Sequence, residues 1–150
     1  MTDIRQATEA DREALIRLLR AQLVEHQIDT PAAGIAAAVD GLLRDPNRGR
    51  LLVATVEGRP VGVAALSFVW PIEHGGRSAW LEELYVEPSH RNRGIGRALL
   101  GAACDTAAAC GAVAVDLEVD AGHQRVARLY EAEGFRPLPR TRFVRRLTPG

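Results

Sequence analysis

The stretch Glu87-Pro-Ser-His-Arg-Asn-Arg-Gly-Ile-Gly-Arg-Ala-Leu-Leu100 joins a strand pattern to a helix pattern and decides how the chain is organised. Apolar, strand-like residues precede it over 80–86, and a helical pattern continues from it over 95–110. Gly94, Gly96 and three arginines lie at the junction. A helix start offers N–H groups that have no intrahelical partner, together with the positive end of the helix dipole, and both favour phosphate. The stretch therefore predicts an anion-binding turn.

The residues before this stretch predict a strand, two helices and a hairpin. The expected elements are a strand at 4–7, a helix from the Thr8–Asp11 region to about Glu25, a helix at 31–44, and strands at 51–56 and 61–68. Thr8 and Asp11 fit a capping box, and Thr30 is expected to cap the second helix, with Pro31 at its first position. A turn at 57–60 joins the two strands, which should therefore pair in antiparallel fashion.

The residues after the stretch predict a crossover connection. The expected elements are a strand at 80–86, a helix at 95–110, a strand at 113–119, a helix at 123–133 closed by Gly134, and last strands at Phe135 and 142–147. A helix between two strands implies a right-handed crossover and a parallel pairing of 80–86 with 113–119. The predicted fold class is α/β (α+β mixed sheet), with helices on the faces of the sheet.

The composition predicts one ordinary globular domain over residues 1–150. The formal net charge is zero, which argues against a general nucleic-acid binder. The N-terminus carries no secretory pattern, and no apolar run approaches the roughly 20 residues of a membrane span, so a cytoplasmic location is the default expectation. Cys104 and Cys110 lie on different faces of a predicted helix without zinc-ligand spacing, so we expect neither a disulfide nor a metal site.

Two common phosphate motifs fit the glycine turn poorly. A P-loop needs a lysine and then a serine or threonine after its last glycine, whereas the dipeptide Arg97-Ala98 stands there. A dinucleotide fingerprint needs a third glycine where Leu99 stands, although Asp116 and Glu118 lie at the distance expected of a ribose-binding acid. A plain turn with solvated arginines also stays open on the residues of the turn alone.

Four motifs follow one another along the chain. Arg91-x-x-Gly94-x-Gly96 is preceded by Leu84-Tyr-Val-Glu-Pro88 and followed by Leu129-Tyr130-Glu131-x-x-Gly134-Phe135, and Ile4-Arg-Gln-Ala-Thr-Glu-Ala-Asp11 lies near the N-terminus. Together they resemble the pyrophosphate motif, the cofactor strand, the second motif and the first strand and helix of the GNAT superfamily of acetyl-CoA-dependent N-acetyltransferases. The resemblance covers essentially the whole chain. It implies a single N-acetyltransferase domain with a mostly antiparallel sheet, a central parallel pair that splays apart, and helices on both faces.

The resemblance implies acetyl-CoA as the co-substrate and no metal. The pyrophosphate would bind the N–H groups of residues 93–98, with charge from Arg91 or Arg93, and the pantetheine would pair with the backbone near 84–86 like an added strand. The implied cofactor-binding residues are Leu84, Tyr85, Val86, Arg91, Arg93, Gly94, Ile95, Gly96, Arg97, Ala98, His123 and Tyr130. His123 departs from the family, which often has asparagine there; the imidazole replaces that contact, caps the helix or faces water.

Amide formation requires a base for the incoming ammonium and an acid for the leaving thiolate. Glu82 and Glu83 are the candidates for the base, and strand alternation places them on opposite faces, which leaves a structural role open for one or both. Relatives with a similar stretch use the first acid, which favours Glu82, whereas Glu83 would hold the amine. The resemblance makes Tyr130 the acid, with a core tyrosine as the alternative. The N–H of Val86 or its neighbour would stabilise the oxyanion.

In this family the acceptor side is built by the first two helices, the loop before the cofactor strand and the C-terminal strands. The substrate-binding candidates offered here are His26, Trp70, His74, Trp80 and Glu83, together with Asp29 and Glu73. Acidic and aromatic groups suit a cationic amine. The sequence thus predicts direct acetyl transfer in a ternary complex to a small primary amine, such as a polyamine-like amine, an amino acid or an aminoglycoside. A protein or peptide N-acetyltransferase and a non-catalytic acyl-CoA sensor are the alternatives, and a homodimer is left open.

Overall fold

The computed structural model describes residues 1–120 and 124–148, and the chain divides into two compact units, Met1–Glu118 and Val119–Gly150. The first unit contains the β-sheet and the helices that cover it, and the second contains a short helix followed by irregular chain. None of the helices in the described ranges is long and apolar enough to cross a membrane.

The described part of the first unit contains a five-stranded sheet in the order β1-β2-β3-β4-β5. The strands are β1 (Thr2–Gln6), β2 (Gly49–Val56), β3 (Arg59–Val69), β4 (Ser78–Val86) and β5 (Val115–Asp116). The pairings of β1 with β2, β2 with β3 and β3 with β4 are antiparallel, and β4 pairs with β5 in parallel. The predicted mixed, mostly antiparallel sheet is confirmed. Its parallel pair lies at the edge of this sheet rather than at its centre, because no described strand follows β5.

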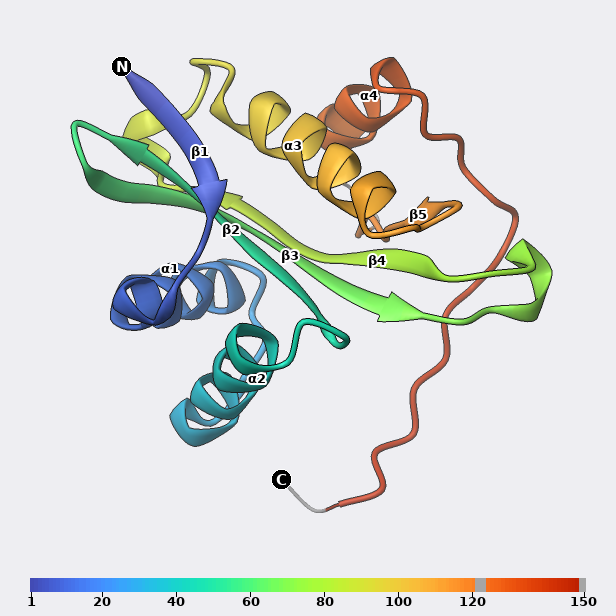
Figure 1. The fold of residues 1–150 in the computed structure, drawn as a ribbon. Helices are drawn as coiled ribbons and strands as arrows, with labels where there is room; N and C mark the ends of the chain where they lie inside the picture. Colours follow the sequence, from blue (N-terminus) through green and yellow to red (C-terminus); the bar gives the residue numbers. More distant parts are fainter. Residues whose placement is uncertain (121–123, 149–150) are drawn as a thin grey trace. The chain divides into compact units, whose positions relative to one another are not determined.

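Helices cover both faces of the sheet, as predicted (Figure 1). Two of them, α1 (Arg12–Glu25) and α2 (Ala32–Arg44), lie on one face, and α3 (Ile95–Ala109) lies on the other. Short 3-10 turns precede α1, β4 and α3; they are η1 (Glu9–Asp11), η2 (Ile72–His74) and η3 (Pro88–His90). The helix α3 connects β4 to β5, which is the crossover that a parallel pair requires.

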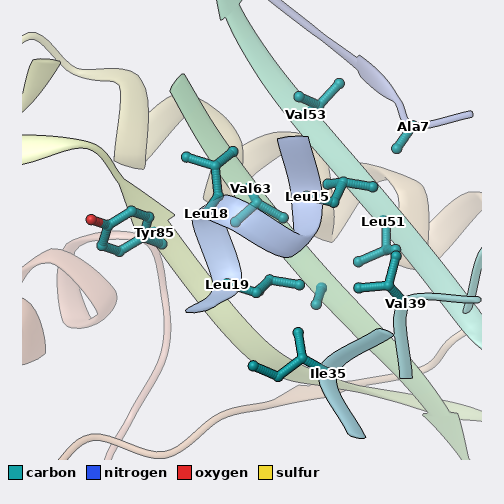
Figure 2. Packing of buried hydrophobic residues seen from close by; sticks show 11 residues of the cluster. Ala7, Leu15, Leu18, Leu19, Ile35, Val39, Leu51, Val53, Val63 and Tyr85 are labelled. Atoms are coloured by element: carbon teal, nitrogen blue, oxygen red, sulfur yellow. The ribbon is translucent and has the colours of Figure 1, made fainter. Parts of the chain in front are cut away.

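The sheet has apolar side chains on both faces because helices cover both. Figure 2 shows the face under α1 and α2, where Leu15 and Leu18 of α1 lie over the side chains of β2 and β3. Tyr85 of β4 lies at the margin of this cluster, with its hydroxyl directed away from the labelled aliphatic side chains. On the opposite face a Cβ at Gly62 would lie 3.0 Å from the Leu99 side chain, so this glycine lets α3 approach β3 closely.

Asp11 fixes the start of α1 to β1. Its carboxylate accepts the Thr8 N–H at 2.8 Å, which confirms the predicted capping box. The Arg5 guanidinium donates to both oxygens of the carboxylate, at 2.8 and 2.9 Å. The bonds from Arg5, against the opposing effect of burial, hold the pKa of Asp11 below its ordinary value, and the Thr8 N–H acts in the same direction.

Two boundaries differ from those predicted. Helix α2 begins at Ala32 with Pro31 in the capping position and no side-chain hydrogen bond at the cap, so the prediction that Thr30 caps this helix is wrong. Pro31 has an extended ψ of 143°, which leaves the threonine one residue too far from the first turn. The strand predicted over 113–119 is shorter in the structure. Only Val115 and Asp116 are in register with β4, opposite Ala79 and Trp80.

The second unit contains α4 (Gln124–Ala132), which ends before Gly134. Gly134 has a φ of 92°, the left-handed conformation that a closing glycine supplies, as predicted. The strands predicted at Phe135 and 142–147 are absent from the described residues, so that prediction is wrong. A strand-like pattern reflects side-chain propensity, but a ladder needs a second strand, and the described residues of this unit form none.

Candidate functional site

Glu82 lies in a β-bulge of β4 that brings two consecutive glutamates to one pocket. In the pairing with β3, Leu66 is opposite Leu81 and Ala65 is opposite Glu83, so Glu82 is the extra residue. In a regular strand neighbouring side chains point to opposite faces, but Glu82 and Glu83 both line the same pocket. The predicted placement of the two glutamates on opposite faces is therefore wrong, and the bulge is the physical reason.

The pocket is bounded by the α1 and α2 helices and by strands β3 and β4, and it has a volume of about 380 Å³. This volume falls within the range of small-molecule sites, about 300–1,000 Å³. Much of the lining is aliphatic and comes from Leu19, Leu23, Ile35, Val39, Leu42 and Ala65. The two carboxylates of β4 give one wall of this largely apolar pocket a negative charge, which suits a cationic group.

The N–H groups of Leu84 and Val86 point away from β3. The N–H of Glu87 donates to the Val61 carbonyl of β3 at 2.9 Å, and alternate residues of an antiparallel strand face the same neighbour. Leu84 and Val86 therefore face the β5 side of the sheet. Within residues 1–118, the pairing of β4 with β5 stops at Trp80, so no strand of this unit covers that part of β4. An extended ligand can add to such an edge through backbone hydrogen bonds.

The turn before α3 is shaped by two residues with positive φ, Asn92 at 63° and Gly94 at 80°. The first intrahelical bond runs from the Ala98 N–H to the Gly94 carbonyl at 3.0 Å, so the earlier N–H groups point out of the helix end. A Cβ on Gly96 would meet only the Val86 side chain, at 3.9 Å. The turn therefore combines outward-pointing N–H groups with two glycines that leave space beside them, as expected of an anion site.

The Arg91 side chain is directed to the ends of α1 and β4. Its Nε donates to the Val86 carbonyl at 2.9 Å, and its two terminal nitrogens donate to the Glu25 carboxylate at 3.0 and 2.7 Å. Its guanidinium carbon also lies 5.4 Å from the centre of the Tyr85 ring. The bond to Glu25 raises the pKa of Arg91 above its ordinary value. Arg91 thus ties the end of α1 to the end of β4.

Gln22 is a residue of this region that the sequence analysis missed. It lies on α1 with 6% of its surface exposed, and its Nε2 donates to the Leu84 carbonyl at 3.5 Å. Its Oε1 has no hydrogen-bond partner among the described residues. Gln22 continues the buried stripe that includes Leu15 and Leu18, and a polar residue in such an apolar stripe is the signal that could have indicated it.

Three of the acceptor candidates lie in different places. Glu83 lines the pocket. Trp70 follows β3 and is 74% exposed, and it is not part of the pocket lining. His26 follows α1, where its backbone N–H donates to the Gln22 carbonyl at 3.0 Å. Of these three, only the glutamate belongs to the pocket wall.

Two further acceptor candidates, His74 and Trp80, lie at the short parallel pair. The Nε2 of His74 is 2.8 Å from the Asp116 carboxylate of β5. Trp80 is opposite Asp116 in the parallel register and is half-buried. Neither His74 nor Trp80 lines the pocket. The bond between the histidine and the aspartate instead joins the loop before β4 to β5.

Tyr130 belongs to α4 in the second unit, where its ring packs edge to face against Phe135 with the ring centres 5.9 Å apart. The backbone N–H of Phe135 also donates to the Tyr130 carbonyl, at 3.0 Å. His123 lies outside the described residues. Among the residues that the structure describes, no group of three or more histidine, cysteine, aspartate and glutamate side chains could hold a metal ion.

Known proteins resemble this chain in sequence. An uncharacterised N-acetyltransferase of Mycobacterium tuberculosis is 37% identical over 94 residues, which cover 63% of this chain and 56% of the relative. The match thus spans little more than half the length of that relative. Thialysine N-epsilon-acetyltransferase of Bos taurus is 28% identical over 148 residues, which cover 90% of this chain and 84% of the relative.

Known structures share the fold. An aminoglycoside N-acetyltransferase solved in complex with CoA aligns with a TM-score of 0.84 at 23% identity, over 99% of this chain and 96% of that one. Residues 12–135 match the model of the Acetyltransferase (GNAT) family. The chain therefore belongs to the GNAT acetyltransferase family.

Proposed function

We propose that this chain transfers an acetyl group from acetyl-CoA to a primary amine of a small molecule. The observation that carries the proposal is that Glu82 and Glu83 line one pocket. They belong to strand β4, whose edge beyond Trp80 is not paired with any strand of residues 1–118. Membership of the GNAT family supports the transfer chemistry. The names of two similar proteins, a thialysine and an aminoglycoside N-acetyltransferase, support a small amine as the acceptor.

Acetyl-CoA supplies the acetyl group as an activated thioester. Its pyrophosphate would bind the N-terminal end of α3, where Gly94 and Gly96 leave the backbone N–H groups accessible and Arg93 and Arg97 add positive charge. In this proposal Arg91 does not bind the pyrophosphate but holds the end of β4, because its guanidinium already binds the Glu25 carboxylate and the Val86 carbonyl. The extended pantetheine arm would accept and donate hydrogen bonds along the open edge of β4.

The reaction needs two proton transfers. A carboxylate of Glu82 or Glu83 takes a proton from the incoming ammonium, and the amine nitrogen then forms a bond to the acetyl carbon. The N–H of Leu84 or Val86 stabilises the oxyanion that forms. The carbon–sulfur bond breaks, and Tyr130 supplies the proton that the leaving thiolate takes. This mechanism requires both units to act as one domain over residues 1–150, which is supported by a family match that extends over both.

Two measurements test the proposal. Calorimetric titration should show binding of acetyl-CoA and no binding of NAD, since the turn lacks the dinucleotide fingerprint. A thiol-release assay should then show release of CoA that depends on an added small amine. Absence of acetyl-CoA binding contradicts the whole proposal. Binding without thiol release from any amine indicates a sensor, and release only with peptides indicates protein modification.

A further inference from the structure

The pocket beside β4 is charged at one wall and apolar over much of the rest. Glu82 and Glu83 supply the carboxylates from β4. Leu19 and Leu23 of α1 and Leu42 of α2 contribute aliphatic surface from the helices. An ammonium group would be attracted to the carboxylates, whereas the rest of the occupant would be surrounded by aliphatic groups.

Small residues of α2 leave room for that occupant. Gly34, Ala37, Ala38 and Gly41 all line the pocket, and larger side chains at these positions would occupy part of its volume. The side chains of Ala37 and Ala38 are exposed, so the helix does not need them for its buried face. The small residues of α2 therefore leave space in the pocket, while its buried residues Ile35 and Val39 still pack in the core.

Arg48 also lines the pocket, but it already has an anionic partner. Its Nε is 3.3 Å from the Asp45 carboxylate. Its terminal nitrogen lies against α2, 2.9 Å from where a Cβ of Gly41 would stand. No other lysine or arginine belongs to the described lining. An acceptor with a carboxylate or phosphonate would thus have to compete with Asp45 for Arg48.

We propose that the acceptor is a monoamine with an apolar body, an alkylamine or arylalkylamine, whose ammonium binds at Glu82 and Glu83. This inference rests on the proposed function and narrows its substrate class. The lining is mostly aliphatic, and Thr30 and Ser67 are the hydroxyl-bearing residues among its described members. A polyamine or an aminoglycoside would place more charged or hydroxyl groups there than these two hydroxyls can hydrogen-bond, and burial of the remainder is costly. The apolar body of a monoamine would instead gain from burial between α1 and α2.

The test compares amines that differ in the body attached to the primary amine. Thiol release from acetyl-CoA is measured with hexylamine, 2-phenylethylamine, lysine, spermidine and neamine at the same pH. The proposal predicts that kcat/KM for hexylamine or 2-phenylethylamine exceeds that for each of the other three by about tenfold or more. A higher kcat/KM for spermidine, neamine or lysine overturns the acceptor class and leaves the acetyltransferase function standing. No release with any amine overturns the proposed function, and the acceptor class with it.

A pair of variants on α2 ties the preference to this pocket. Ala38→Phe fills part of the pocket from an exposed position, and Ala33→Phe places the same side chain on an exposed position outside the lining. We expect Ala38→Phe to lower kcat/KM for 2-phenylethylamine about tenfold with an unchanged KM for acetyl-CoA, and Ala33→Phe to leave both at the wild-type values. Equal amine kinetics in the two variants overturn the proposal that this pocket binds the acceptor.

Discussion

Glu82 and Glu83 are neighbours in one strand and line one pocket, because the bulge opposite Leu66 and Ala65 interrupts the alternation of β4. Two carboxylates in one pocket can divide two tasks, proton removal and attraction of the ammonium. A regular strand would leave one of the two under α3, on the far side of the sheet. The bulge is thus the local feature on which the proposed chemistry depends.

Isosteric variants separate the two tasks. Glu82→Gln should lower kcat by about a hundredfold, with the KM for acetyl-CoA unchanged, because it removes the base. Glu83→Gln should mainly raise the KM for the amine. Glu57→Gln in the exposed turn between β2 and β3 is the matched control and should behave like the wild type. Wild-type kcat and KM values in both pocket variants would contradict a role for either glutamate.

The N-terminal end of α3 gives a prediction in which stability and binding change in opposite directions. Gly96→Asp places a negative charge at a helix start, where it favours folding, but it repels a pyrophosphate at the same N–H groups. We expect an unchanged or higher Tm and acetyl-CoA binding weaker by about tenfold or more. Gly101→Asp adds the same charge to open space further along α3 and should leave binding unchanged. Equal acetyl-CoA affinities for the two variants would show that the anion site is elsewhere.

Removal of the Tyr130 hydroxyl tests the proposed acid. Tyr130→Phe keeps the ring that packs against Phe135, so the fold of the second unit should persist. If the phenol protonates the thiolate, kcat at saturating substrates should fall by about a hundredfold while acetyl-CoA affinity stays within about twofold of the wild type. The measurement is steady-state thiol release together with calorimetric titration. An unchanged kcat rules out the acid role.

Acid should weaken the fold partly through Asp11. Because the pKa of this carboxyl is lower in the folded protein, it stabilises the fold above the unfolded value of about 4 and loses that contribution as the pH falls through the folded value. Asp11→Asn removes the charged partner of Arg5 and should cost about 1–3 kcal/mol at neutral pH. Urea unfolding at neutral pH and near pH 3 should show a smaller pH-dependent loss for the variant. A loss equal to that of the wild type would exclude Asp11 as a contributor.

The sequence predicted most of the elements that have local signals. The hairpin around 57–60, the start of α3 after Gly94, and the parallel pairing at the crossover all follow from turn residues, helix periodicity and chain connection. The capping box of Thr8 and Asp11 is also visible in the sequence, because its partners are three residues apart. The hairpin, the helix start and the capping box depend on residues close together in the chain, and the parallel pairing follows from the helix that connects the two strands.

The features that the sequence did not predict depend on distant partners. The bulge at Glu82 arises from the register between β3 and β4, and no residue type in the strand indicates it. The bond from Arg91 to Glu25 joins residues far apart in the chain, and nothing in the motif around Arg91 indicates that partner. The contact of His74 with Asp116 likewise joins residues that are distant in the chain.

The most direct measurement follows the acetyl group itself. The protein is incubated with acetyl-CoA labelled in the acetyl carbon, with and without 2-phenylethylamine, and the label in protein, thioester and amine is determined by mass spectrometry. Direct transfer in a ternary complex predicts one acetylated amine for each thiol released, with no label on the protein and no thiol release without the amine. Label retained on the protein, or acetyl-CoA bound but left intact with every amine and peptide supplied, would contradict it.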